Sequence, residues 1–250
     1  MNLNPLTLIK ALGRYMIFLG KTVSQTERFS VYPGLIMDEM VNIGSKSVFI
    51  VSVVSVFIGA VTAVQTAHNL FSPFVPKLVV GTIVRDMVLL ELSTTFTCVI
   101  LAGKVGSNIA GNLGTMRITE QIDALDVMGI NSASYLALPK IIAGTAMVPL
   151  LTILSCFLGI IGGYLGAVAS GLITNSEYVE GIRTSFVPYN ILFALVKATV
   201  FGFLITSISA FEGFYTKGGS LEVGVASTNA VTNSCIALLV ADYVIAGIML

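Results

Sequence analysis

Glu91, Lys197 and Asp242 are ionisable residues that stand inside long apolar runs of this 250-residue sequence. A charged side chain at bilayer depth is costly, and such residues commonly pair with one another or mark a transport pathway. We therefore expect Lys197 to form an internal ion pair, with Asp242 or Glu91 as its partner. For Asp242, which lies near the end of its run, exposure at the membrane surface is the alternative.

Other reactive residues are sparse, and their spacing does not suggest catalysis. His68 is the single histidine and has no metal-ligand companions in the sequence. The cysteines lie far apart in apolar runs, at Cys98, Cys156 and Cys235, which is typical of small buried side chains rather than a disulfide or metal site. The sequence lacks the nucleotide-binding pattern G-x-x-x-x-G-K-[ST], and Lys217-Gly218-Gly219 is its nearest approach.

The composition indicates an integral membrane protein. Charged residues make up 10% of the chain and apolar residues 55%, with a mean hydropathy of +0.93. A soluble domain has roughly 25% charged residues. Several uncharged runs exceed the ~20 residues that cross a bilayer. The net charge of zero gives no reason to expect nucleic acid as a partner.

We expect an all-α fold with five transmembrane helices. The runs that define them cover about residues 47–70, 84–110, 138–173, 189–210 and 223–248. The third run is long enough that it must tilt or project beyond the bilayer. The spans leave no room for a second soluble domain.

Residues 5–30 have the pattern of an amphipathic helix lying in the membrane interface. One face carries apolar residues and the opposite face basic ones, namely Leu8, Leu12, Tyr15, Leu19 and Val23 against Lys10, Arg14 and Lys21. A poor first membrane span is the weaker alternative, and no cleavage site of a signal peptide follows. Charged residues then indicate a water-exposed connection around residues 32–34, at Glu27, Arg28, Asp38 and Glu39. We therefore expect a single domain, with an interfacial region at 1–46 and the bundle at 47–250.

The positive-inside rule predicts a cytoplasmic N-terminus and an external C-terminus. Nine basic residues then lie inside and three outside: Lys10, Arg14, Lys21, Arg28, Lys46, Lys104, Arg117, Lys140 and Lys217 against Lys77, Arg85 and Arg183. This orientation places the polar segment 103–139 in the cytoplasm.

Small residues recur every fourth position in the spans, a pattern that lets helix backbones approach closely in lipid. The clearest rows are Ala102, Gly106, Ala110 and Gly114, and Ser155, Gly159, Gly163, Ala167 and Gly171; weaker rows are Ser55, Gly59, Ala63 and Ala67, and Ala194, Ala198, Gly202 and Ala210. We expect these rows to pack helices rather than bind a ligand.

The polar segment contains a predicted short helix at residues 119–128. An apolar stripe of Ile122, Leu125 and Met128 is expected on it, with Glu120 in the first turn, where the helix dipole favours an acid. Gly129 would end the helix. Such a helix is either a solvated interfacial loop or an element that docks in a groove on a cytosolic partner.

One family resemblance covers the chain from about Gly34 onward. The run GKVGSNIAGNLGTMRITEQIDALDVMGINSASYLALPKIIA resembles the signature of MlaE/YrbE-type permeases, the membrane subunits of MCE-associated lipid ABC transporters. Three shorter segments are also similar: Phe57-Ile58-Gly59 with Gln65, the stretch 212–231, and Asp242-Tyr243. Where the family usually carries Arg-Glu-Leu-Gly-Pro, this chain has Leu90-Glu91-Leu92-Ser93-Thr94. Arg85 is a candidate for the missing cation.

The resemblance implies a homodimer in the bacterial inner membrane that moves phospholipids between the inner and outer membranes. It also implies two cytosolic ATPase subunits, which hold the ATP and magnesium, and a periplasmic MCE-domain ring. The permease itself would need no cofactor and catalyse no bond chemistry. The short helix would couple it to the ATPase through Glu120, Gln121, Ile122, Asp123, Leu125, Asp126 and Met128.

The lipid cavity implied by the resemblance involves the first and second spans, with Glu91, Leu92, Leu90, Thr62 and Asn69 as candidates. Two other functions compete. A secondary transporter driven by ions through Glu91, Lys197 and Asp242 would usually show inverted repeats, and none is evident. A membrane enzyme of lipid metabolism would need clustered catalytic residues at the interface.

Overall fold

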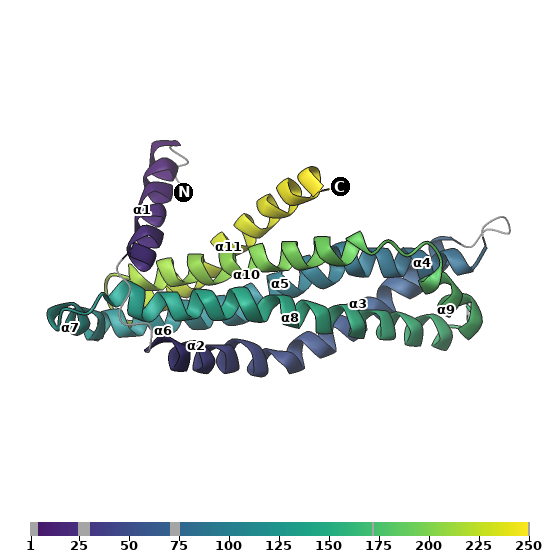
Figure 1. Cartoon of the computed structure of the whole chain (residues 1–250), viewed down its shortest axis with the longest axis horizontal. Helices are drawn as coiled ribbons and strands as arrows, with labels where there is room; N and C mark the ends of the chain where they lie inside the picture. The colour runs from purple at the N-terminus through teal and green to yellow at the C-terminus, as the bar shows by residue number, and fades with distance from the viewer. Residues whose placement is uncertain (1–4, 25–30, 71–75, 172, 250) are drawn as a thin grey trace.

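A computed structural model describes residues 5–24, 31–70, 76–171 and 173–249, with side chains from Lys10 onward. Its regular elements are all helices, and no strand occurs in these ranges (Figure 1). Five helical segments are long and apolar enough to cross a membrane: Tyr32–Asn69, Leu78–Ile118, Ser132–Ala169, Tyr189–Phe214 and Ser220–Met249. The predicted all-α membrane fold is confirmed.

The first segment begins earlier than predicted. It joins α2 (Tyr32–Met40) to α3 (Lys46–Asn69) through a π-helical turn, η1 (Val41–Ser45). The connection expected around residues 32–34 is wrong because Pro33 stands in the first turn of α2, where a proline suits a helix start. Asp38 and Glu39 belong to α2, and Glu39 forms an ion pair with Lys140. Glu27 and Arg28 lie outside the described residues.

The second segment also extends beyond its prediction at both ends. It consists of α4 (Leu78–Met87), η2 (Val88–Phe96), α5 (Thr97–Leu101), η3 (Ala102–Gly106) and α6 (Ser107–Ile118), with π-helical turns in η2 and η3. Its 41 residues span about 60 Å, twice a bilayer core of roughly 30 Å. The first half of the polar segment 103–139 is therefore a continuation of this helix.

The remaining spans are α8 (Ser132–Ala169), α10 (Tyr189–Phe214) and α11 (Ser220–Met249). The start of α8 is fixed by Asn131, whose side chain accepts a hydrogen bond from the Ser134 amide at 3.4 Å. With 38 residues, α8 is about 57 Å long, so it must tilt or project beyond the bilayer, as expected of the third span.

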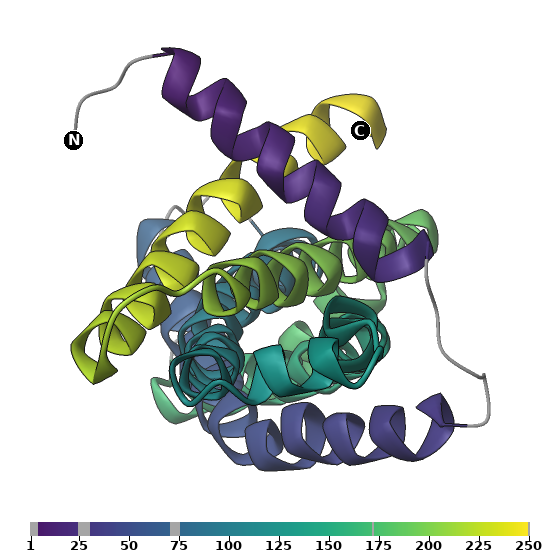
Figure 2. The same ribbon diagram turned by 90° about the vertical axis from the view of Figure 1, so that its left-hand side faces the viewer.

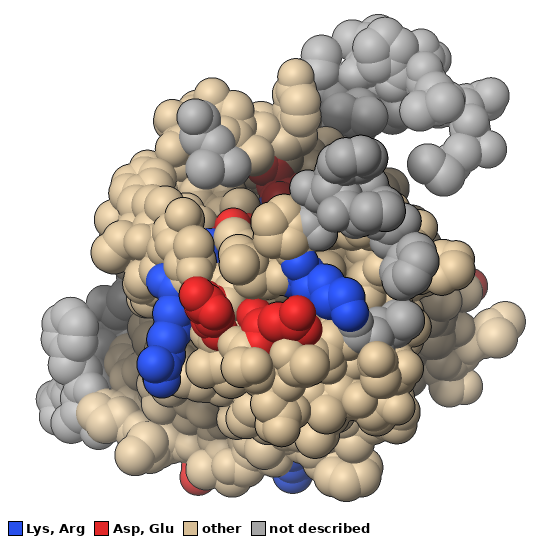
Figure 3. Space-filling model, turned by 90° about the vertical axis from the view of Figure 1, so that its right-hand side faces the viewer, with Lys and Arg blue, Asp and Glu red and all other residues tan. Residues whose placement is uncertain are grey.

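A short helix that the sequence did not predict, α9 (Asn175–Arg183), lies between α8 and α10. It begins with a capping box in which Thr174 and Glu177 bond each other's backbone amides. These bonds from the Thr174 amide and hydroxyl lower the pKa of the Glu177 carboxyl. α9 packs beside α4, and basic and acidic side chains lie close together at that end of the molecule (Figure 3).

The rows of small residues pack α3 against α8. Ser55, Gly59, Ala63 and Ala67 are all buried on α3. A Cβ atom at Gly59 would overlap the Gly159 carbonyl, and one at Gly166 would lie 2.7 Å from the Ala60 oxygen. The Ser55 hydroxyl donates to Ser155 Oγ across the same contact at 2.7 Å. The prediction that these rows serve helix packing is confirmed here.

The N-terminal helix α1 (Pro5–Ser24) runs across the end of the bundle rather than along it (Figures 1 and 2). Phe18 is fully buried against rings of α10, and the Tyr15 hydroxyl lies 2.7 Å from Ser207 Oγ. Leu12 and Val23, which belong to the predicted lipid-facing side, are exposed. The helix thus has three faces: one packs on α10, one is apolar and contacts no other described part of the chain, and one is basic. The sequence predicted the apolar and basic faces but not the packing face.

Candidate functional site

An ion cluster joins three of the long helices. Lys197 of α10 is fully buried, and its ammonium lies 2.9 Å from Glu91 Oε2 of η2 and forms an ion pair with Asp242 of α11. It also donates to the Leu90 carbonyl at 3.0 Å. The sequence left either carboxylate as the partner of Lys197, and the structure pairs it with both.

Thr95 completes the cluster. Its hydroxyl lies 3.1 Å from Glu91 Oε2 and 3.0 Å from Asp242 Oδ2, so it can donate to either carboxylate. The sequence did not identify Thr95, because nothing distinguishes it from the other threonines of its run. Both Glu91 and Thr95 belong to η2, and π-helical turns occur frequently at functional sites.

The cluster carries more negative than positive charge. Two carboxylates share one ammonium, and the rings of Phe193 and Phe201 lie 5.4 and 5.9 Å from Lys197 Nζ, where their faces stabilise the cation. The Glu91 side chain is 49% exposed, whereas that of Asp242 is 16% exposed. Glu91 is therefore the carboxylate best placed to meet a ligand with hydrogen-bond donors or positive charge.

Arg85 does not pair with Glu91. It binds Asp86 at 2.9 Å and the carbonyls of Ile182, Thr184 and Ser185 at 2.8, 2.7 and 3.2 Å, and it is 2% exposed. These bonds use the whole guanidinium to fasten the chain between α9 and α10 to α4. The suggestion that Arg85 supplies the missing cation is wrong, and Lys197 occupies that place.

The candidate lipid-cavity residues fall on two sides of the second span. Glu91 and the Leu90 carbonyl belong to the ion cluster. Leu92 packs instead with the apolar cluster that includes Ala63 of α3. On α3, the Thr62 hydroxyl donates to the Ile58 carbonyl at 2.7 Å, and Asn69 is exposed at the end of the helix. The structure does not bring Thr62 and Asn69 to Glu91, and their contact with lipid stays a prediction.

An apolar cavity of about 370 Å³ lies between α8, α10 and η2. Its walls are almost entirely hydrocarbon, from residues such as Leu89, Ile153, Phe157, Ile160, Ile191 and Leu195. The size falls within the range of small-molecule pockets. The cavity could not be predicted from the sequence, because its lining residues are indistinguishable from other apolar positions of the spans.

The short helix of the polar segment is α7 (Gln121–Val127), at the same end of the bundle as α1 (Figure 1). Glu120 is its N-cap residue, with a left-handed φ of 60°, so the expectation that it lies in the first turn is wrong. Gly129, with φ of 79°, ends the helix as predicted, and the Gly129 and Ile130 amides bond the Asp126 and Leu125 carbonyls.

The expected apolar stripe of α7 is wrong as well. Ile122 is fully buried against its own chain and Leu125 is half-buried, whereas Met128 is 66% exposed. Val127, which the sequence did not single out, is 88% exposed. A bond of 2.6 Å from Arg117 to Asp123 ties α7 to α6. The surface that α7 offers to a partner is thus centred on Val127 and Met128.

Comparison with known proteins agrees with this architecture. The model of the family Permease MlaE matches residues 36–248, which include most of the first and last spans, the three spans between them and α7. The chain belongs to this family. A probable ABC transporter permease protein of Rickettsia bellii is 36% identical over 238 residues, covering 95% of this chain and 92% of that protein.

Two more distant relatives carry names that concern lipids. The intermembrane phospholipid transport system permease protein MlaE of Haemophilus influenzae is 28% identical over 243 residues, 96% of this chain and 92% of that protein. The chloroplastic protein TRIGALACTOSYLDIACYLGLYCEROL 1 of Arabidopsis thaliana is 29% identical over 92% of this chain and 66% of that protein. This MlaE-family chain is a multi-pass membrane permease.

Proposed function

We propose that this permease moves phospholipids between the inner and outer membranes of a bacterium, with energy from a separate cytosolic ATPase. The observation that carries the proposal is the half-exposed Glu91 carboxylate beside the fully buried Lys197. It offers a polar contact for a lipid headgroup within helices that are otherwise apolar. The name of the Haemophilus influenzae relative supports phospholipid as the cargo.

The coupling contact in this proposal is α7. The sequence has no nucleotide-binding pattern, so the energy has to enter through a protein contact. Val127 and Met128 are large apolar residues exposed on a short helix at the projecting end of the bundle, which suits docking in a groove on the ATPase. That ATPase would hold ATP and magnesium.

The second span provides the mechanical connection. One helical segment, Leu78–Ile118, carries Glu91 and leads directly into the turn before α7. A shift of α7 on ATP binding would therefore move the helix that holds the ion cluster. The π-helical turns η2 and η3 interrupt its regular hydrogen bonding, and such turns are places where a long helix bends.

The assembly we propose is a homodimer in the inner membrane with one ATPase subunit on each copy. α1, α7 and the N-terminus face the cytoplasm, and the C-terminus faces the periplasm. A periplasmic MCE-domain protein would meet the end that carries α9. The acyl chains would occupy apolar space between the helices while the headgroup lies near Glu91.

Substitution of Val127 by Asp tests the coupling contact. The permease would be purified with its ATPase subunit, and lipid-stimulated ATP hydrolysis would be measured. We expect Val127→Asp to lose the ATPase from the complex and with it the stimulation, because a charge cannot enter an apolar groove. Val179→Asp is the matched control, an exposed valine on the short helix α9 at the opposite end. Intact assembly in Val127→Asp would contradict the assignment.

An ion-coupled secondary transporter is the second candidate, because the cluster carries two carboxylates for one ammonium. It predicts lipid movement by this chain alone when a proton or sodium gradient is applied. The lipid ABC permease predicts no movement without the ATPase.

A further inference from the structure

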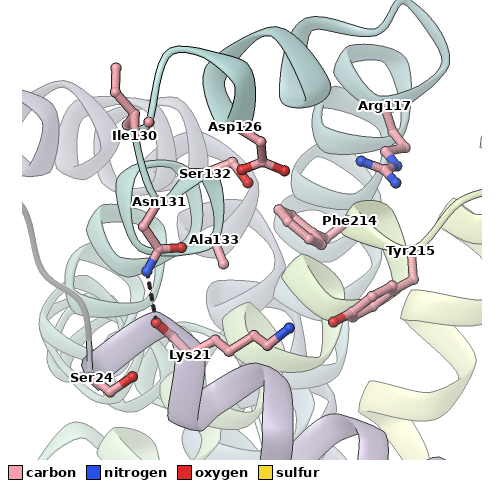
Figure 4. Close-up of a pocket in the computed structure, with 11 residues that line it drawn as sticks. Lys21, Ser24, Arg117, Asp126, Ile130, Asn131, Ser132, Ala133, Phe214 and Tyr215 are labelled. Atoms are coloured by element: carbon pink, nitrogen blue, oxygen red, sulfur yellow. Dashed lines mark hydrogen bonds between the residues drawn. The ribbon is translucent and has the colours of Figure 1, made fainter.

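A polar cavity of about 700 Å³ lies at the α7 end of the molecule (Figure 4). Four elements enclose it: the end of α1, the end of α6, the connection from α7 to α8, and the end of α10. Its lining includes Lys21, Arg117, Asp126, Asn131, Ser132 and Tyr215. None of these residues belongs to the ion cluster, and Asp126 alone was a coupling candidate.

Charged groups of both signs converge on this cavity. In Figure 4 the Lys21 ammonium extends into the space toward Tyr215, while the Asp126 carboxylate and the Arg117 guanidinium point toward each other. Nη1 of Arg117 donates to Asp123, and no other described residue accepts a hydrogen bond from the remaining donors of Arg117. Within the described ranges, the Lys21 ammonium and the Asp126 carboxylate also have no hydrogen-bond or ion-pair partner.

The position of the cavity relates it to the membrane surface. α1 forms one wall, and its exposed apolar residues Leu12, Met16 and Val23 suit a helix that lies in the lipid interface. The Asn131 amide donates to the Lys21 carbonyl at 3.1 Å and fixes the end of α1 beside the start of α8. Phe18 packs on Phe214 and Tyr215 below the cavity.

We propose that this cavity binds the headgroup of a zwitterionic aminophospholipid. The phosphate would accept charge-assisted hydrogen bonds from Lys21 and Arg117, and the headgroup ammonium would donate to Asp126. Two cations and one carboxylate match a phosphate ester that also carries an amine. The inference rests on the proposed function at one point: because the protein is proposed to move phospholipids, the headgroup is taken to belong to a lipid rather than to a soluble phosphate ester.

Occupancy of the cavity would act on the coupling helix. Asp126 belongs to α7, and Arg117 holds α7 through Asp123, so a bound headgroup would join α7 to α1 through Lys21. A phospholipid of the cytoplasmic leaflet would then stabilise the position of α7 that the ATPase meets.

Thermal unfolding of the full chain in neutral detergent micelles tests the proposal. The probes are phosphatidylethanolamine, phosphatidic acid and diacylglycerol with the same acyl chains, and water-soluble phosphoethanolamine. At about a hundredfold excess over its Kd, we expect phosphatidylethanolamine to raise the midpoint by roughly 5 °C. Lys21→Gln should lose this shift, while Lys10→Gln, a substitution on the same basic face of α1, should keep it.

Further comparisons separate this site from the transport site. In the Glu91→Gln background, which removes the proposed transport contact, Lys21→Gln should lower the shift caused by phosphatidylethanolamine as much as in the unchanged chain. Asp126→Asn should lose the preference for phosphatidylethanolamine over phosphatidic acid. If phosphatidylethanolamine raised the unfolding midpoint of Lys21→Gln as much as that of the unchanged chain, the site would be overturned even if ATP-driven lipid transport persists. An equal shift of the unfolding midpoint by diacylglycerol would overturn headgroup recognition. An equal shift by phosphoethanolamine would show that the ligand need not be a lipid.

Discussion

At the scale of single residues, the central feature is an ammonium that compensates two carboxylates among apolar helices. Lys197 has no exposed surface, and among the described residues its charge is stabilised by Glu91, Asp242, the Leu90 carbonyl and two aromatic rings. Removal of one member of a buried ion pair leaves the other charge uncompensated, and this usually costs more than replacement of both.

Lys197→Met should therefore lower the free energy of unfolding by roughly 3–5 kcal/mol. Combining it with Asp242→Asn should recover part of this loss, because one uncompensated carboxylate is then removed. Denaturant unfolding in micelles measures both, with the exposed Lys217→Met as the control. Simple addition of the two single losses in the double variant would contradict a coupled cluster.

The Thr95 hydroxyl gives a second test of the cluster. Thr95→Val keeps the shape of the side chain and removes the donor shared by the two carboxylates, which should cost about 1–3 kcal/mol. Thr199→Val is the matched control on α10, since its exposed hydroxyl bonds only its own helix at the Leu195 carbonyl. Equal unfolding midpoints for the two variants would show that Thr95 does not stabilise the carboxylates.

At the scale of elements, the close contact between α3 and α8 depends on glycines, which have no side chain to keep the helices apart. A Cβ atom at Gly162 would overlap the Val56 carbonyl, which is backbone and cannot move aside as a side chain can. The helices therefore approach closely enough for backbone contact, which is how helices associate without a hydrophobic driving force.

Gly162→Leu should force α3 and α8 apart and lower the free energy of unfolding by about 1–3 kcal/mol, the size seen for overpacked cores. Gly13→Ala on α1 is the control, because a Cβ atom there meets nothing within 4 Å. Thermal unfolding in micelles compares the two. A Gly162→Leu midpoint equal to that of Gly13→Ala would contradict close packing of α3 on α8.

The sequence predicted the elements better than their ends and contacts. Apolar runs longer than a bilayer and rows of small residues identify spans and packing faces directly. The helix ends were missed because α2, α6 and the start of α8 carry polar and charged residues, so hydropathy does not mark them as parts of a span. The packing face of Phe18 and the left-handed Glu120 depend on partners distant in sequence or on a local turn. The same holds for Thr95, whose role exists only where three helices meet.

At the scale of the whole molecule, one helical segment links a residue of the ion cluster to the proposed coupling helix α7. Leu78–Ile118 carries Glu91 along its length and passes into α7 at its end. Movement of a docked ATPase would thus be transmitted to the proposed headgroup contact at Glu91 through this one helical segment. The ion-coupled alternative would leave the exposed Val127 and Met128 without a function.

The most direct test of this account is lipid transfer by the reconstituted complex. The permease, its ATPase and the MCE-domain protein would be placed in vesicles, and transfer of a fluorescent phospholipid to acceptor vesicles would be followed. We predict transfer that requires ATP, is lost in Val127→Asp and persists in Val179→Asp. Transfer by the permease alone under an ion gradient, with no ATPase present, would contradict the account.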